Sequence, residues 1–417
     1  MKWQRLGSLN GKVWNILIGT IVTRTALFMS TPFLAMYLSD HKQISVQLTG
    51  YVLGINPLAN VLFSGFGGAL ADRLPARRTL SVVPVCWGVV FILFFYADSF
   101  WQFLLLSGLN GLCYAIFEPA SKKQLSIHSP KEQHLLVFNL RYAAINIGAF
   151  AGPLLSLLLR MDRTLLPYVL LGVSYILYGL STMYFFRDLP ASHGRGLPRA
   201  AGHPRRSAFA AISGDTVFLL LLAGTACSFF GYSQLNASVS QYVSGSPVFT
   251  NGLGIYSLLL SANAVIILAA QYFVLAWMQG RNPFTILIAG NLLIGLSFPA
   301  FLLPSASLAP WLFILLFSLG ELLLSARFDA LVNELAPPED KGLYFGCAES
   351  IKAGTILGPV CGTYLLSQFG LGSPLPVFGI LGGITVAGSL LLGMARRRHG
   401  KQQQKPQLPA AAAVTDQ

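Results

Sequence analysis

Long apolar runs follow one another along almost the whole chain, and most charged residues lie in the short gaps between them. About 18 consecutive apolar residues are enough for a helix to cross a bilayer. Helices are expected because backbone groups find no water partner in hydrocarbon, and the runs lack the alternation of barrel strands. We predict an all-α membrane protein with twelve crossings, at 13–38, 47–71, 80–97, 100–121, 135–159, 165–186, 214–242, 251–278, 284–303, 308–331, 344–367 and 375–394.

Composition and charge exclude a water-soluble protein and a nucleic-acid-binding protein. Of the 417 residues only 10% are charged, against about 25% in an average soluble domain. The net charge of +13 could indicate nucleic-acid binding, but the loops on the side of the termini carry 21 Lys and Arg residues and the opposite loops carry 3. This asymmetry follows the positive-inside rule, so we predict a multi-pass protein of the cell membrane with both termini in the cytoplasm and no nucleic-acid partner.

A change in composition divides the chain in two. Residues 187–213 are rich in Pro, Gly and Arg and have no apolar period, which indicates a cytoplasmic linker. The linker separates an N-terminal six-helix bundle, 1–186, from a C-terminal one, 214–395. The remaining residues, 396–417, are rich in Gln, Pro and Ala beyond the last basic cluster, and we predict a disordered cytoplasmic tail there.

The motif GxxxGP occurs once in each half, 206 residues apart. Its residues are Gly148, Gly152 and Pro153 in the fifth run and Gly354, Gly358 and Pro359 in the eleventh. Glycines one helical turn apart let another helix approach closely. The repetition indicates a duplicated six-helix unit, so we expect two pseudo-symmetric bundles around a central site, the arrangement of an alternating-access transporter.

The segment GGALADRLPARRTL, residues 67–80, carries one acid and three arginines between the second and third runs. It resembles the signature of the loop between helices two and three of the major facilitator superfamily, with Gly68, Asp72, Arg73 and Arg77 at matching positions. The resemblance implies that the Asp contacts the N-terminus of a helix of the other half and pairs with the arginines, as a cytoplasmic latch. The alternative is that the arginines are only positive-inside anchors.

The GxxxGP motif of the fifth run resembles the glycine-proline motif of the drug:proton antiporters of this superfamily. That resemblance implies twelve helices, action as a monomer, and proton-driven efflux of amphipathic compounds. The alternative for the motif is ordinary packing of small residues. We find no Walker motif and no Cys/His spacing typical of a metal site, so we expect a proton gradient rather than ATP, and no metal or other cofactor.

Ionisable residues within the apolar runs are the candidates for proton coupling, because they are costly at such depth. Glu321 and Arg24 lie in the middle of the tenth and first runs. Glu321 has no cation at helical spacing, so it is either a proton-exchanging carboxyl or the partner of Arg24 or of another cation. Glu118 and Arg141 lie at similar depth in the fourth and fifth runs and form either a neutralising pair or a gate. Glu349 and Lys352, three residues apart, are expected to pair.

Uncharged polar and aromatic residues complete the candidate site. The substrate-cavity candidates are Gln234, Asn236, Asn263 and Tyr232. We expect a secondary active transporter and not an enzyme, since no catalytic set of residues is present. Proton-coupled efflux of amphipathic drugs or small metabolites is favoured by the few charges available for a cavity. The alternatives are a proton-coupled importer of a nutrient or small metabolite, and a membrane sensor that does not transport.

Overall fold

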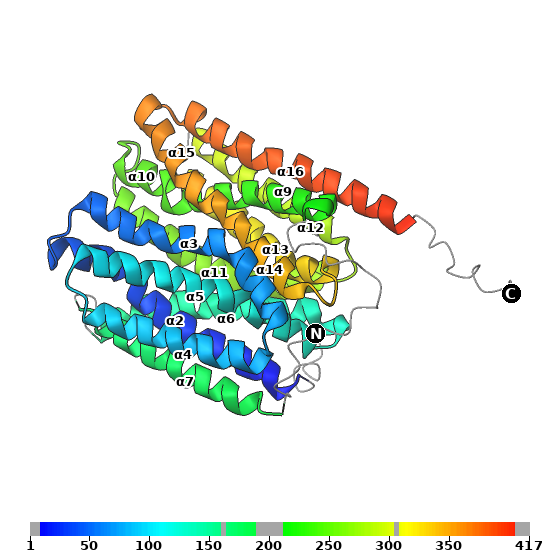
Figure 1. Ribbon diagram of the computed structural model, residues 1–417. Coiled ribbons are helices and arrows are strands. Elements are labelled where there is room, and N and C mark those ends of the chain that lie inside the picture. The colour runs from blue at the N-terminus through cyan, green and yellow to red at the C-terminus, as the bar shows by residue number, and fades with distance from the viewer. Residues whose placement is uncertain (1–8, 160–163, 189–211, 304–307, 405–417) are drawn as a thin grey trace.

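A computed structural model describes residues 9–159, 164–188, 212–303 and 308–404, and within these ranges it contains helices and no strand (Figure 1). The N-terminal half comprises α2 (Gly11–Asp40), α3 (Val46–Arg73), α4 (Ala76–Phe95), α5 (Phe100–Ile127), η1 (Lys131–Gln133), α6 (His134–Leu158) and α7 (Leu166–Phe185). The C-terminal half comprises α9 (Thr216–Ser233), η2 (Gln234–Asn236), α10 (Ser238–Gly245), α11 (Gly252–Met278), α12 (Pro283–Ser297), η3 (Phe298–Leu302), α13 (Ala309–Leu335), α14 (Lys341–Ala348), η4 (Glu349–Lys352), α15 (Ala353–Phe369) and α16 (Pro374–Gln404).

Eleven of the predicted crossings are present as helical segments long and apolar enough to span a membrane, counted over the described ranges. The twelfth, predicted at 344–367, is not one continuous helix. It is divided into α14, the 3-10 turn η4 and α15, and the turn consists of Glu349 to Lys352, which includes both charged residues of this segment. The crossing predicted at 214–242 is similarly interrupted, by η2.

The prediction for the C-terminal tail is wrong over its first residues. Residues 396–404 are helical and extend α16 as far as Gln404, beyond the predicted end of the last crossing. Residues 405–417 lie outside the described part of the chain, as do residues 189–211 of the predicted linker.

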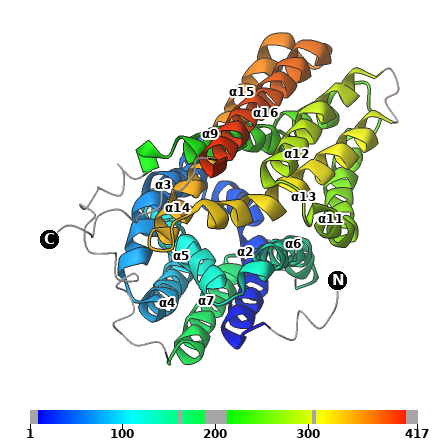
Figure 2. The same cartoon turned by 90° about the vertical axis from the view of Figure 1, so that its right-hand side faces the viewer.

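The buried apolar side chains form two large clusters that follow the two halves. One contains residues of the N-terminal half, among them Trp87 and Tyr175. The other contains residues of the C-terminal half together with Phe138 of α6. Figure 2 shows the same division, with most of the N-terminal half toward the lower left of the view and most of the C-terminal half toward the upper right. Each half therefore has its own core, as expected for two bundles that move relative to one another.

The two GxxxGP motifs make equivalent packing contacts in the two halves. A Cβ on Gly148 would lie 2.7 Å from the Thr25 amide nitrogen of α2, and one on Gly152 would lie 2.6 Å from the Thr25 carbonyl oxygen. In the C-terminal half, a Cβ on Gly354 would lie 2.2 Å from the Ala226 carbonyl oxygen of α9. Only glycine allows such close approach of backbones. The fifth and eleventh crossings thus pack on the first and seventh, which fits a duplicated unit.

The prolines of the two motifs both lie within their helices. Pro359 is inside α15. Pro153 is inside α6, and its side chain lies outside what the structure describes. Gly358 packs on the interrupted part of the seventh crossing, since a Cβ there would lie 3.0 Å from the side-chain nitrogen of Gln234 in η2.

Candidate functional site

The crossing of α3 with α14 joins the two halves through one carboxylate. Asp72, in the last turn of α3, accepts hydrogen bonds from the amides of Gly342 (2.8 Å) and Leu343 (2.7 Å), in the first turn of α14. The ammonium group of Lys123 lies 2.6 Å from the same carboxylate. An anion at the N-terminus of a helix meets unpaired N–H groups and the positive end of the helix dipole, so this contact stabilises the joined halves.

Glycines bring the two helices close enough for this contact. A Cβ on Gly68 would lie 2.1 Å from the Gly342 carbonyl oxygen, and one on Gly346 would lie 2.1 Å from the Ser64 carbonyl oxygen. Gly68, predicted as part of the latch, therefore contributes by its lack of a side chain. The glycines of α14 do the same on the opposing surface.

The prediction that Asp72 pairs with the arginines of its loop is wrong. Among the described residues, the cation that contacts Asp72 is Lys123 of α5, while Arg73 is exposed and Arg77 is partly exposed. The reason is the length of α5. The sequence predicts that the fourth crossing ends at 121, but α5 continues to Ile127 and buries both Lys122 and Lys123 between the halves.

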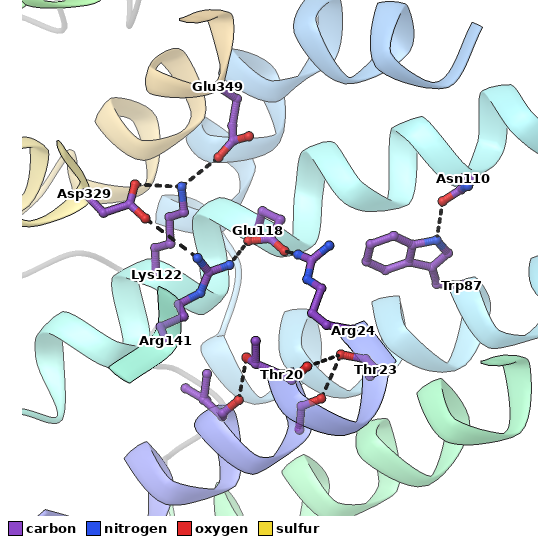
Figure 3. Close-up of polar contacts among 12 residues, drawn as sticks. Thr20, Thr23, Arg24, Trp87, Asn110, Glu118, Lys122, Arg141, Asp329 and Glu349 are labelled. Carbon is purple, nitrogen blue, oxygen red and sulfur yellow. Dashed lines mark hydrogen bonds and ion pairs between the residues drawn. The ribbon is translucent and has the colours of Figure 1, made fainter. Parts of the chain in front are cut away.

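Seven charged side chains form a continuous chain in which the sign alternates. The chain runs through Arg24, Glu118, Arg141, Asp329, Lys122, Glu349 and Lys352, and Figure 3 shows it from Arg24 to Glu349. It starts in α2, continues through α5 and α6 and reaches α13 and η4, so it crosses from one half to the other. Each acid lies between two cations along this path.

The contacts between the halves are made by the middle of this chain. Lys122 lies 2.9 Å from Asp329 and 2.8 Å from Glu349, and Arg141 lies 3.7 Å from Asp329. The predicted Glu118–Arg141 pair is present, and Glu118 also binds Arg24. Arg24 therefore pairs with Glu118 and not with Glu321.

Two members of the chain are not predicted from the sequence. Lys122 lies one residue beyond the predicted crossing 100–121, and Asp329 lies inside the predicted crossing 308–331. The position of Asp329 is the only signal in the sequence that could identify it, because an acid within a crossing is costly unless it is paired. The predicted pair of Glu349 and Lys352 is present at 2.6 Å.

Glu321 lies apart from this chain and has uncharged partners. Its carboxylate accepts hydrogen bonds from the hydroxyl of Tyr142 in α6 and from the side-chain amide of Asn263 in α11, both at 3.0 Å. The residue is buried, with 7% of its surface exposed, and none of the ion pairs among the described residues involves it. The bond to Tyr142 crosses between the halves.

The four cavity candidates have different surroundings. Asn263 contacts Glu321, and Tyr232 stacks on Phe317 with ring centroids 5.9 Å apart. Gln234 is fully buried, donates to the Phe230 carbonyl and accepts from the Ser238 hydroxyl, so its side chain supports the break in the seventh crossing. Asn236 is exposed and accepts a hydrogen bond from Tyr256.

The sequence matches the Major Facilitator Superfamily over residues 16–352, which is most of the chain. The chain belongs to the Major Facilitator Superfamily. This finding agrees with the helix pattern, the two halves and the residues of the loop 67–80, and it identifies the protein as a membrane transporter that works by secondary transport.

Individual members of the superfamily are similar over nearly their whole length. The chain is 34% identical over 397 residues to the uncharacterised MFS-type transporter YqjV of Bacillus subtilis (strain 168), with 95% of this chain and 96% of the relative covered. It is 24% identical over 393 residues to a Na(+), Li(+), K(+)/H(+) antiporter of Planococcus maritimus, with 87% and 91% covered.

A solved structure confirms the major facilitator fold. The crystal structure of a bacterial homologue of the iron transporter ferroportin, in an outward-facing state, superposes with a TM-score of 0.73 at 15% identity. The superposition covers 94% of this chain and 99% of that one.

In this superfamily member the polar contacts between the halves gather toward one end. Figure 1 shows α2 beginning and α16 ending at the same end of the molecule, which we call the terminal end. Near it, in addition to the contacts above, Asn333 of α13 lies 2.7 Å from His134 of α6, and Gln271 of α11 donates to Asn139 of α6. Farther from it, α15 packs on α9, α16 and α10 of its own half. The terminal end is therefore closed.

Proposed function

We propose that this transporter exchanges protons for a small amphipathic compound, expels that compound from the cell, and uses Glu321 as the proton-carrying carboxyl. The observation that carries the proposal is the bonding of Glu321. A buried carboxylate held only by neutral donors has no permanent charge partner, so a proton is the means of neutralising it within the membrane. The Planococcus maritimus relative is a cation/proton antiporter by name, which supports this role.

Protonation of Glu321 would act directly on the contact between the halves. An ionised carboxylate accepts from both Tyr142 and Asn263. A protonated carboxyl has lost its charge and one of its acceptor sites, so the charge-assisted bond from Tyr142 weakens. Loading a proton at Glu321 thus loosens α6 from α13 and favours separation of the halves.

The orientation in the membrane follows from the positive-inside rule, which places the terminal end in the cytoplasm. The closed terminal end then corresponds to an outward-facing state, in which protons reach Glu321 from outside. Separation of the halves at the terminal end would release those protons inside and open the site to cargo from the cytoplasm. On this account the transporter acts as a monomer, and the proton gradient drives it without ATP.

Proton flux in proteoliposomes tests the proposal. Purified protein is reconstituted with a pH indicator inside, a pH gradient is imposed, and a panel of amphipathic compounds is added. In the wild type, transported compounds should accelerate decay of the gradient. Glu321→Gln removes the proton-binding group but keeps the size of the side chain, so the acceleration should fall to the level of protein-free liposomes.

The matched control is Glu132→Gln, which neutralises an exposed acid of η1. It should leave the flux unchanged. Proton movement that is equal in Glu321→Gln and in the wild type would show that Glu321 is structural. Compound-dependent flux that is absent from the wild type across the whole panel would refute the exchange itself.

A further inference from the structure

Both ends of the alternating charge chain reach the same aromatic ring. The guanidinium carbon of Arg24 lies 5.4 Å from the centroid of the Tyr114 ring, and the ammonium nitrogen of Lys352 lies 4.0 Å from it. Tyr114 belongs to α5 of the N-terminal half and Lys352 to η4 of the C-terminal half. The seven charged residues and this ring therefore form a closed circuit that spans the two halves, with a cation at each end where it closes on the ring.

The circuit carries one positive charge too many. Its cations are Arg24, Arg141, Lys122 and Lys352, and its acids are Glu118, Asp329 and Glu349. Along the chain each acid separates two cations, but no acid of the described residues pairs with both Arg24 and Lys352 where they meet Tyr114. An unbalanced buried charge is costly.

The two end cations differ in how far they are exposed. The side chain of Lys352 is 26% exposed, whereas that of Arg24 is 9% exposed and that of Lys122 is 9% exposed. Tyr114 is itself half-buried. A small anion can therefore reach the open end of the circuit at Lys352, while the interior ion pairs are shielded by the helices around them.

We propose that the missing acid is supplied by the cargo: a single anionic group, a carboxylate or sulfonate, binds between Lys352 and Arg24 against Tyr114. The surplus of one positive charge selects monoanions over cations and neutral compounds. This inference rests on the proposed transport function and narrows its cargo to amphipathic monoanions.

Binding of a matched series of naphthalene compounds tests this site. The series is 1-naphthoate, 1-naphthamide and 1-naphthylmethylammonium, which share one apolar body and differ in charge. Titration calorimetry on the full-length protein in lipid nanodiscs should show naphthoate binding at least about tenfold more tightly than the amide, equivalent to about 1.4 kcal/mol. The ammonium compound should bind no better than the amide.

Variants of Lys352 test whether the preference for naphthoate over the amide arises at this site. Lys352→Gln removes the surplus charge while Glu349 keeps its second partner, Lys122, so the preference for naphthoate over the amide should disappear. Lys352→Arg keeps the charge and should keep the preference. Lys131→Gln removes one charge from an exposed position and should change nothing. Size-exclusion profiles of all variants establish that they are folded.

Two results would overturn the site. The first is equal affinity of the wild type for naphthoate and the amide. The second is a preference that persists in folded Lys352→Gln. Neither depends on proton flux, so a failure of this site is distinguishable from a failure of Glu321 as the proton carrier: Glu321→Gln should still distinguish naphthoate from the amide.

Discussion

Replacing Glu118 by Gln should destabilise the protein more than any other single neutralisation of an acid. Glu118 is the acid that binds both Arg24 and Arg141, and all three side chains are buried. The substitution leaves Arg24 without an acid partner among the described residues. Removing one partner of a buried ion pair typically costs about 3–5 kcal/mol, because the remaining charge stays desolvated. The free energy of unfolding, measured in mixed micelles with a denaturing detergent, should fall by that amount.

The control for Glu118→Gln is an ion pair at the surface. Asp98 binds Lys42, and its side chain is 83% exposed. An exposed pair contributes only about 0–1 kcal/mol, so Asp98→Asn should have little effect. Equal and small losses in the two variants would mean that the interior of the charge chain is well hydrated, and the closed circuit would then no longer require an anion.

Replacing Asp72 by Asn should open the terminal end. The carboxylate accepts from two backbone amides of α14 and from Lys123. In Asn one of the two oxygens becomes an NH₂ group, which faces a donor whichever way it turns. Hydrogen bonds to charged groups contribute about 1.5–3 kcal/mol each, and about 1.4 kcal/mol corresponds to a tenfold change in an equilibrium.

A native cysteine reports this opening. Cys347 lies in α14 against α3, where its sulfur is 3.4 Å from the position of a Cβ on Gly65. With the other four cysteines replaced by Ser, a hydrophilic maleimide should label Cys347 at least about tenfold faster in Asp72→Asn than in the parent. Arg73→Gln neutralises an exposed neighbour and should label like the parent. Equal rates in all three proteins would show that Asp72 does not hold α3 to α14.

The sequence predicts those features of this site that depend on position along the chain. Glu321, Glu118 and Arg24 are recognisable as costly because they lie within apolar runs, and the duplicated GxxxGP motif predicts the two halves. The contact of Asp72 with a helix N-terminus of the other half follows from the resemblance of its loop.

Partners across space are not predictable in the same way. Lys123 and Asp72 are 51 residues apart, and their contact depends on α5 running past the predicted end of its crossing. Apolar periodicity locates the middle of a helix better than its end, since capping and tertiary contacts decide where the last turns lie. For the same reason, the sequence does not predict that Lys122 is buried, and it favours Arg73 as the partner of Asp72.

The breaks in the seventh and eleventh crossings depend on packing. Gln234 lies in a break and is buried against α15, where a Cβ on Gly362 would lie 2.2 Å from its side-chain oxygen. A polar residue in an apolar run is equally consistent with a substrate cavity and with such a buried contact. Only the position of the neighbouring helix distinguishes the two.

The distance between the halves at the terminal end is the measurement that tests most directly whether protonation of Glu321 separates them. Lys131, the first residue of η1, and Pro338, in the turn before α14, are exposed and belong to opposite halves, so spin labels can be attached there through Lys131→Cys and Pro338→Cys on a cysteine-free background. Pulsed electron paramagnetic resonance in lipid should give mainly a short distance in the ionised wild type. Glu321→Gln, which mimics the protonated carboxyl, should shift the distribution toward a longer one. A single short distance in both proteins would contradict the coupling of Glu321 to the movement of the halves.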